Sequence, residues 1–353
     1  MKTTVNKQQF IDILSKGPII RDCILSDTLL EKYIFPQTQF INVTFNNVTF
    51  QRCTLKFATF DHCEFNNVQI QSSQLELCTF IECSMLQICF EQCQQNASVF
   101  QKNTVREFNT SAGSIFNASF IEQDMTGLFT KTGIKHCGFN RCFFSGLTLR
   151  ECLFSSSALG SCRLENTTLE TCSLDRINFR GSQFRQSSFT GSTMTDCIFD
   201  EAHLEAMDFR STKLMQRLNF HKATLIQVAF GPSLSDRVLF HQARLDSVRF
   251  HACLIPKSIF TEAQIHHGTF EDCDIAKSHF NHTDIRDSRF SHCNLEYNHF
   301  NYSRIADSQF TDSNMNFTKQ HDMLTDNVAF TRVSMNHIQT TDEAQLAAER
   351  WRV

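Results

Sequence analysis

The chain has 353 residues, and its 33 Lys and Arg against 37 Asp and Glu give a formal net charge of −4. This near balance excludes a strongly basic nucleic-acid-binding protein, and it lacks the heavy acidic excess of a protein that imitates DNA phosphates. Apolar residues make up 41% of the chain, but no stretch resembles a cleavable signal or is long enough to cross a bilayer.

The first predicted element is a short amphipathic helix at the N-terminus. Residues Asn6 to Lys16 place Phe10, Ile13 and Leu14 on one side, and Gly17-Pro18 stops the helix. We assign residues 1–20 to this element. We expect its apolar side to pack against the part of the chain that follows it.

From Leu25 onward an apolar residue recurs at every fifth position. An α-helix repeats at about 3.6 residues and a strand at two, so neither element alone produces this spacing. Each unit must therefore contain a short extended segment and a bend that turns the chain back inward. We call the recurring residue the centre of its unit. The first long run of centres reads Phe35, Phe40, Phe45, Phe50, Leu55, Phe60 and Phe65.

The repeat weakens between residues 91 and 128. Some centres there are polar, and two Phe residues stand out of phase. We expect this degenerate segment to bulge or loop away from the coil, and loops on a rigid scaffold often carry function. The candidate partner-binding residues in it are Arg106, Glu107, Phe108 and Phe116.

The phase of the centres shifts twice. It moves one residue earlier at Phe129, continues so to Leu214, and returns to the original phase at Phe220. We expect one extra residue at positions 215–219, accommodated as a bulge or a slipped corner.

The number of units in each turn of the coil follows from the centres after Phe220. Large and smaller centres alternate there from one unit to the next. If the large centres share faces of the coil, each turn must contain an even number of units. Cys253, Cys273 and Cys293 recur every twenty residues, which favours four units per turn. Four sides of five residues make a square coil.

Many units place a small residue two positions before the centre, as in Ala223-Thr224-Leu225 and Cys293-Asn294-Leu295. In this pattern, from roughly Cys23 to Met315, the chain resembles the pentapeptide-repeat proteins. The resemblance implies an all-β solenoid, a right-handed quadrilateral parallel β-helix with the central and the small residue pointing to the axis. We assign residues 21–338 to this β-helix.

Fifteen of the 16 cysteines occupy the small position, and only Cys89 falls elsewhere. We interpret them as small buried hydrophobes. Their spacings of five and ten residues match no usual zinc or iron–sulfur ligand pattern, so we predict no metal and no cofactor. A reducing compartment is the simpler expectation, in agreement with a cytoplasmic protein.

The last predicted element is a helix in residues 339–353. Thr341-Asp342-Glu343 can cap it, and its apolar residues include Leu346 and Trp351. A solenoid must cover its terminal coils, so we interpret the helices at both ends as short capping helices. The alternative is a homodimer contact through Leu346 and Trp351, as in some members of the family.

Side chains outside the repeat pattern are candidates for contact with partners. Phe57, Phe143 and Phe317 should face outward and form contact patches. Twelve of the 14 histidines lie between His203 and His337, and His221 should stack on His241. We interpret the histidines as ordinary polar residues at corners, with a pH-sensitive or metal-binding stripe as the alternative.

No motif in the chain points to an enzyme. It has no nucleophile elbow and no phosphate-binding glycine loop, so we predict no catalytic residues. Our leading hypothesis is a non-catalytic rigid scaffold or adaptor for protein partners in a bacterial cell, without direct nucleic-acid binding. The opening of the chain is similar to segments found with type VI secretion components, and export without a signal peptide is compatible with this hypothesis.

The alternative is a DNA-mimicking protein that binds gyrase or another topoisomerase, of the quinolone-resistance type. Related proteins of that type carry loops that interrupt a coil, as predicted for residues 91–128. An acidic column down one face would favour this alternative, because column position and not overall composition sets the surface charge.

Overall fold

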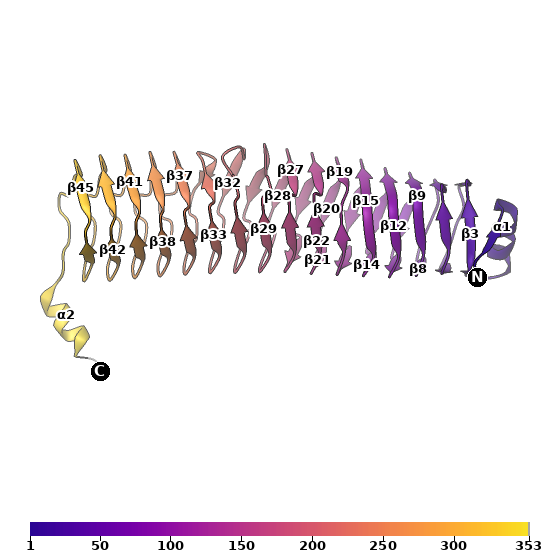
Figure 1. Ribbon diagram of the computed structural model, residues 1–353, viewed down its shortest axis with the longest axis horizontal. Coiled ribbons are helices and arrows are strands. Elements are labelled where there is room, and N and C mark those ends of the chain that lie inside the picture. Colours follow the sequence, from indigo (N-terminus) through magenta and orange to yellow (C-terminus); the bar gives the residue numbers. More distant parts are fainter. Residues whose placement is uncertain (352–353) are drawn as a thin grey trace. The chain divides into compact units, whose positions relative to one another are not determined.

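The computed structural model describes residues 1–351, in which parallel strands wind into four-sided coils of a β-solenoid, and a short helix lies near each terminus (Figure 1). Neighbouring strands pair in parallel with an offset of twenty residues, so that Phe80 lies between Phe60 and Phe100. Twenty residues are four five-residue units, and each unit forms one side of a coil. The predicted four-sided parallel β-helix is confirmed.

Contacts divide the chain into two compact units. The N-terminal unit comprises Met1–Ser182 and Ser187–Ser192. Its elements are β1 Thr3–Val5, α1 Lys7–Lys16, β2 Ile19–Arg21, β3 Cys23–Ser26, β4 Leu29–Glu31, β5 Gln39–Ile41, β6 Thr44–Asn46, β7 Thr49–Gln51, β8 Thr59–Asp61, β9 Glu64–Gln71, β10 Gln74–Glu76, β11 Thr79–Ile81, β12 Ser84–Glu91, β13 Gln94–Asn96, β14 Val99–Gln101, β15 Thr104–Ser111, β16 Ser114–Phe116, β17 Ser119–Ile121, β18 Asp124–Met125, β19 Leu128–Thr130, β20 Gly133–Lys135, β21 Gly138–Asn140, β22 Phe143–Ser145, β23 Thr148–Arg150, β24 Leu153–Ser155, β25 Ala158–Gly160, β26 Arg163–Glu165, β27 Thr168–Glu170 and β28 Ser173–Asp175.

The C-terminal unit comprises Gln183–Gln186 and the chain from Thr193 onward. Neither of the two helices in the described part of the chain has the length and apolarity to span a membrane. The elements of this unit are β29 Gln183–Arg185, β30 Thr193–Thr195, β31 His203–Glu205, β32 Leu214–Gln216, β33 Thr224–Ile226, β34 Ala229–Phe230, β35 Leu234–Ser235, β36 Arg244–Asp246, β37 Arg249–His251, β38 Gln264–His266, β39 Thr269–Glu271, β40 Asp284–Arg286, β41 Arg289–Ser291, β42 Arg304–Ala306, β43 Gln309–Thr311, β44 Leu324–Asp326, β45 Ala329–Thr331 and α2 Glu343–Arg350.

Most sides of the coil end at a corner residue, two positions after the centre, in the left-handed backbone region. Tyr297 is typical, with φ of 60°, and its N–H donates to the Asn316 carbonyl of the next coil at 3.0 Å. This hydrogen bond offsets the cost of the unusual conformation. The residue after the centre and the corner residue therefore both face outward, whereas consecutive residues of a flat strand point to opposite faces.

Stacked aromatic rings fill much of the interior. In the C-terminal unit Phe260 is fully buried, with its ring centroid 4.9 Å from Phe240 and 4.6 Å from Phe280. The planes are inclined by 16° and 4°. Each such pair contributes about 0.5–1.5 kcal/mol beyond the burial of apolar area. The columns of centres thus join each coil to the next.

The cysteines line the same interior. Fifteen are buried and Cys89 is half-buried. Their thiols donate to backbone carbonyls, as from Cys63 Sγ to the Phe40 oxygen at 3.2 Å. Burial raises the pKa of the Cys78 thiol to about 12 and that of Cys137 to about 11. They behave as the small hydrophobes expected from their position.

Helix α1 covers the first coil. Asn6 and Gln9 form a capping box at its start, in which each side chain bonds the other residue's backbone N–H at 2.9 Å. Phe10 on its inner side is fully buried, 6.4 Å from the rings of both Phe40 and Phe45. The N-terminal helix therefore acts as a cap.

The loop expected within residues 91–128 does not form. Strand β15 pairs in register with β12, with Ile88 opposite Phe108 and Phe90 opposite Thr110. Phe108 takes the small position and Thr110 the centre, so a large and a small side chain have exchanged places in the same unit. Both are buried, and the coil continues without a break.

The first phase shift depends on Gly127. Opposite β15 the offset falls from twenty residues at Met125 to nineteen at Phe129. Gly127, with φ of +140°, lies in the shortened unit, and a Cβ atom there would sit 2.1 Å from the Phe108 carbonyl oxygen. Only glycine allows the backbones to approach so closely.

The second phase shift lies earlier than predicted. The centre of β32 is Met215, which is fully buried and pairs with Met194, whereas Leu214 is half-buried. Thr212 is the buried small residue of this unit, so the extra residue falls between Thr212 and Met215. The assignment to 215–219 was wrong because two adjacent apolar residues, Leu214 and Met215, are equally acceptable centres in the sequence.

We predict that Gly127→Ala destabilises the N-terminal unit by about 3 kcal/mol or more, because it combines a backbone clash with an unfavourable φ. Urea unfolding followed by circular dichroism measures the change. Gly138→Ala is the matched control, because no atom lies within 4 Å of a Cβ built there. Equal stability of the two variants would contradict the close approach at Gly127.

Candidate interaction surfaces

The residues predicted for the loop do not share one surface. Arg106 and Glu107 are exposed, and Phe108 is buried against Phe90 at 5.1 Å, so it is not available to a partner. Phe116 is 39% exposed. It lies two units after Arg106, which places it on the opposite side of a four-sided coil. The exchange of Phe108 and Thr110 was visible only by comparing residues twenty apart.

The three other candidate aromatics do lie on the outside. Phe57 is 44% exposed, with Lys56 Nζ 5.4 Å from its ring centroid. Phe143 is half-buried beneath the Arg163 guanidinium at 5.0 Å. Phe317 is 38% exposed and belongs to a larger group.

We call this group the aromatic corner; it consists of Tyr297, Phe317 and His337, which are corner residues of three successive coils. Tyr297 stacks on Phe317 at 4.8 Å and 5°, and Phe317 stacks on His337 at 5.1 Å and 12°. Lys277, the corner residue of the preceding coil, places Nζ 5.8 Å from the Tyr297 centroid. Sequence analysis singled out Phe317 but missed this column.

Charged residues of opposite sign alternate between coils. Arg150 Nε lies 2.8 Å from Glu170, Arg185 lies 3.2 Å from Glu205, and Arg332 pairs with Asp312. These pairs are largely exposed and each contributes little to stability. The DNA-mimic alternative requires a continuous acidic column down one face. On the faces where these pairs lie, the Arg residues interrupt such a column.

Histidines form part of the outer surface of the C-terminal unit. His221 stacks on His241 at 5.2 Å and 8°, as predicted. Among the described residues one group of three potential metal ligands lies within 4.8 Å, namely His251, Glu271 and Asp272. All three are exposed, and an exposed ion pair of 3.4 Å between His251 Nδ1 and Glu271 explains their proximity.

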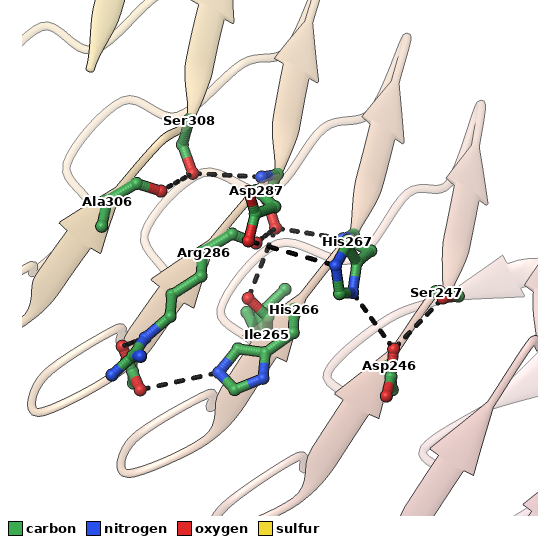
Figure 2. Close-up of polar contacts among 12 residues, drawn as sticks. Asp246, Ser247, Ile265, His266, His267, Arg286, Asp287, Ala306 and Ser308 are labelled. Atoms are coloured by element: carbon green, nitrogen blue, oxygen red, sulfur yellow. Dashed lines mark hydrogen bonds and ion pairs between the residues drawn. The ribbon is translucent and has the colours of Figure 1, made fainter. Parts of the chain in front are cut away.

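Other histidines link coils to each other. Figure 2 shows His267 between two carboxylates, with Nδ1 3.3 Å from Asp246 and Nε2 4.0 Å from Asp287. Burial raises the pKa of Asp246, but hydrogen bonds from His267 and Ser247 outweigh burial and hold it below its usual value. The neighbouring His266 has its Nε2 3.5 Å from Asp284, which also pairs with Arg286 at 2.9 Å. These contacts fasten neighbouring coils together.

The interior offers little space to a ligand. A cavity inside the N-terminal unit, lined by residues such as Phe139, Leu149 and Phe154, measures only about 20 Å³. Ligand pockets typically have volumes of about 300–1,000 Å³. A ligand of ordinary size does not fit this cavity, and the candidate interaction surfaces lie on the outer faces.

Helix α2 attaches to the side of the last coils (Figure 1). Leu346 is 8% exposed, and Glu349 accepts hydrogen bonds from the Tyr302 hydroxyl at 2.8 Å and from His321 Nε2 at 3.3 Å. Arg350 lies 3.7 Å from Asp322. Leu346 is thus used within the chain, whereas Trp351 is 92% exposed.

The C-terminal helix does not cover the final coil, contrary to our expectation of a cap. Phe330 of β45 continues a buried Phe column above Phe310 but is 40% exposed. Other apolar residues of this coil are only half-buried. They are Met323, Val328, Val333, Met335 and Ile338. The lateral contacts of Glu349 and Arg350 hold α2 away from this surface.

Comparison with known proteins concerns the repeat. The family described as "Pentapeptide repeat region" matches residues 132–209, 202–280 and 263–340. No curated protein matches the chain at a significant level.

Solved structures share the repeat at low sequence identity. One is HetL, a pentapeptide repeat protein involved in heterocyst differentiation regulation from the cyanobacterium Nostoc, with 12% identity, 79% of this chain and 96% of that chain covered, and a TM-score of 0.25. Full-length QnrB1, a plasmid-mediated fluoroquinolone resistance protein, shows 13% identity, 92% and 100% coverage, and a TM-score of 0.18. Scores this low carry no inference about function.

We predict that acidification releases α2 before the coils unfold. Hydrogen bonds from Gln345 and then Tyr302 hold the pKa of Glu349 below its usual value. A carboxyl group with a lowered pKa stabilises the folded contact above its unfolded pKa, and that contribution is lost as the pH falls through the lowered value. The fluorescence anisotropy of Trp351, the only Trp, should fall as the pH drops below ~4.3, the ordinary pKa of a glutamate.

Far-UV circular dichroism, recorded at the same time, must stay constant through this transition. Glu349→Gln should show low anisotropy already at neutral pH, because an amide oxygen accepts hydrogen bonds from Tyr302 and His321 more weakly than a carboxylate does. An unchanged acid transition in this variant would contradict the role of Glu349.

Proposed function

The chain belongs to the pentapeptide-repeat family, because the repeat region of that family matches residues 132–340, more than half of the 353 residues. Members of this family share a coil whose side chains fill the axis. The function of such a molecule is set by the side chains that remain on its faces and corners.

We propose that this protein is a non-catalytic scaffold that binds a protein partner through its outer surface. The observation that carries the proposal is the aromatic corner. Tyr297 and Phe317 are 44% and 38% exposed, although they are large and partly apolar. Aromatic residues held rigidly on a surface bury a large area on binding and lose little conformational entropy.

The gyrase-binding alternative has less support. The expected loop at 91–128 is absent, and acidic residues such as Glu170 and Glu205 pair with Arg residues of a neighbouring coil. Association with a secretion system and a cytoplasmic location are finer parts of our proposal, and identification of the partner tests both.

We further propose that a second copy of the chain covers the final coil. Phe330 and its half-buried neighbours form an apolar end surface that α2 leaves open. Trp351, which is 92% exposed on the same unit, is available to the second copy. This assigns the homodimer contact to the coil end and Trp351 instead of Leu346.

Sedimentation equilibrium at micromolar concentration should show a dimer for the natural chain and a monomer for Phe330→Asp, because the substitution buries an unpaired charge in the contact. Leu254→Asp is the control, since Leu254 is 55% exposed on a side of the coil. A natural chain that sediments as a monomer would contradict the homodimer.

The scaffold itself is tested by affinity capture from a bacterial lysate followed by mass spectrometry. We expect a reproducible partner whose recovery falls at least about tenfold with Tyr297→Ala combined with Phe317→Ala. Leu153→Ala, which truncates a side chain that is 64% exposed in the N-terminal unit, should not affect recovery. Recovery of gyrase or topoisomerase IV subunits as the main partner would refute the scaffold and favour the alternative.

A further inference from the structure

A groove runs along one corner of the C-terminal unit, next to the aromatic corner. We call it the basic groove. It has a volume of about 350 Å³, and its floor includes Leu218 and Val238, each 1% exposed. Three successive coils supply its two rims. One rim consists of Arg217, Arg237 and Lys257, and the other of Asn219, Leu239 and Ile259.

The residue columns that form the two rims continue along the unit beyond the groove. After Lys257 the first rim passes to the corner residue Lys277 and then to the aromatic corner. The second rim continues in strand register through His279, His299 and Lys319. At a spacing of ~4.8 Å per coil, the six steps from Arg217 to His337 extend over about 29 Å. This is the length of roughly nine residues of extended chain.

The net charge of this corner is positive, although the whole chain carries −4. Asp196 pairs with Arg217 at 2.7 Å, and Asp236 lies 3.8 Å from Arg237. Within the described residues, Lys257, Lys277 and Lys319 have no carboxylate within ion-pair distance. The other three corners of the same coils carry carboxylates; examples are Glu262, Asp272 and Asp287. This corner therefore carries unpaired lysines, whereas the other corners combine basic residues such as Lys222 and Arg332 with carboxylates.

The lowered pKa of His299 agrees with the positive charge of this corner. Burial lowers its pKa, and the neighbouring charges of His279 and Lys319 lower it further. The ring of His279 contacts that of His299 at 4.7 Å. Lys319 thus lies on the second rim beside a histidine whose charged form is disfavoured, and no ion pair with a carboxylate involves either side chain among the described residues.

We propose that the basic groove binds an extended acidic segment of a partner protein. Carboxylates of the segment pair with Lys257 and Lys277, and its apolar side chains lie on Leu239 and Ile259. This inference rests on the proposed scaffold function and names the chemistry of the partner. The charge complementarity between unpaired lysines and carboxylates selects this occupant.

The geometry favours an acidic peptide over a single-stranded nucleic acid. Nucleic acid bases stack on exposed aromatic faces. The faces of Tyr297 and Phe317 already cover each other at 4.8 Å, so mainly their edges remain.

The segment must bind through its side chains. The backbone groups along the groove are already paired between coils, as from the Lys257 N–H to the Ala276 carbonyl at 2.8 Å and from the Ile259 N–H to the Val238 carbonyl at 3.0 Å. The segment therefore cannot join the sheet as an additional strand. Binding through exposed charges should weaken as salt is added.

The test uses the full-length chain and a fluorescein-labelled peptide of roughly nine residues, the length of the corner column from Arg217 to His337, in which Glu alternates with Leu and Ser. Fluorescence anisotropy should report binding that Lys257→Glu combined with Lys277→Glu weakens at least about tenfold. Arg249→Glu combined with Arg289→Glu makes the same charge change on another face and should leave binding within about twofold. The peptide with Gln in place of Glu should not bind.

Three outcomes would overturn the basic groove as an acidic-peptide site. They are absence of peptide binding to the natural chain, equal weakening by both double variants, and preferential binding of an oligothymidine that only the Lys257 and Lys277 variant loses. Capture of a partner from lysate that survives this variant would leave the scaffold standing and refute the groove. Peptide binding without any captured partner would instead count against the scaffold function.

Discussion

The structure depends on one constraint, the twenty-residue register between parallel strands. It places every centre directly above the centre of the coil before it, as Phe260 lies above Phe240. The backbone hydrogen bonds and the ring stacks then stabilise the same arrangement. Because each coil contacts mainly its neighbours, stability is close to a sum of local contributions. A departure from the repeat can therefore be absorbed within one or two coils.

The departures show how this absorption works. Gly127 shortens one unit because the backbone approaches Phe108 with no side chain between them. Phe108 and Thr110 keep the volume of their unit by exchanging sizes, which dense interior packing tolerates better than a change of total volume. Neither departure opens a loop. The surfaces that we propose for binding are therefore its corners and its final coil.

The same register organises the surface. Two outward residues at each corner recur every twenty residues, so the surface consists of columns that are nearly independent of the core. One column brings Tyr297, Phe317 and His337 into a continuous stack. The rims of the basic groove are built in the same way from residues that are distant in the sequence. Overall composition, with nearly equal acidic and basic residues, conceals this segregation of charge.

The amino-acid sequence was sufficient to establish the coil, its four sides, the inward cysteines and both terminal helices, because a five-residue period leaves few alternatives. The sequence misplaced the second phase shift because Leu214 and Met215 are equally apolar and either could be the centre of its unit. It also predicted a loop that does not form, because a large residue at the small position, Phe108, is balanced by a small residue at the centre, Thr110. Only the tertiary structure shows that α2 lies beside the final coil and that three corner residues form one aromatic surface. The physical reason is that these features depend on contacts between coils. The sequence of a single unit does not specify which side chains of the neighbouring coil will contact it.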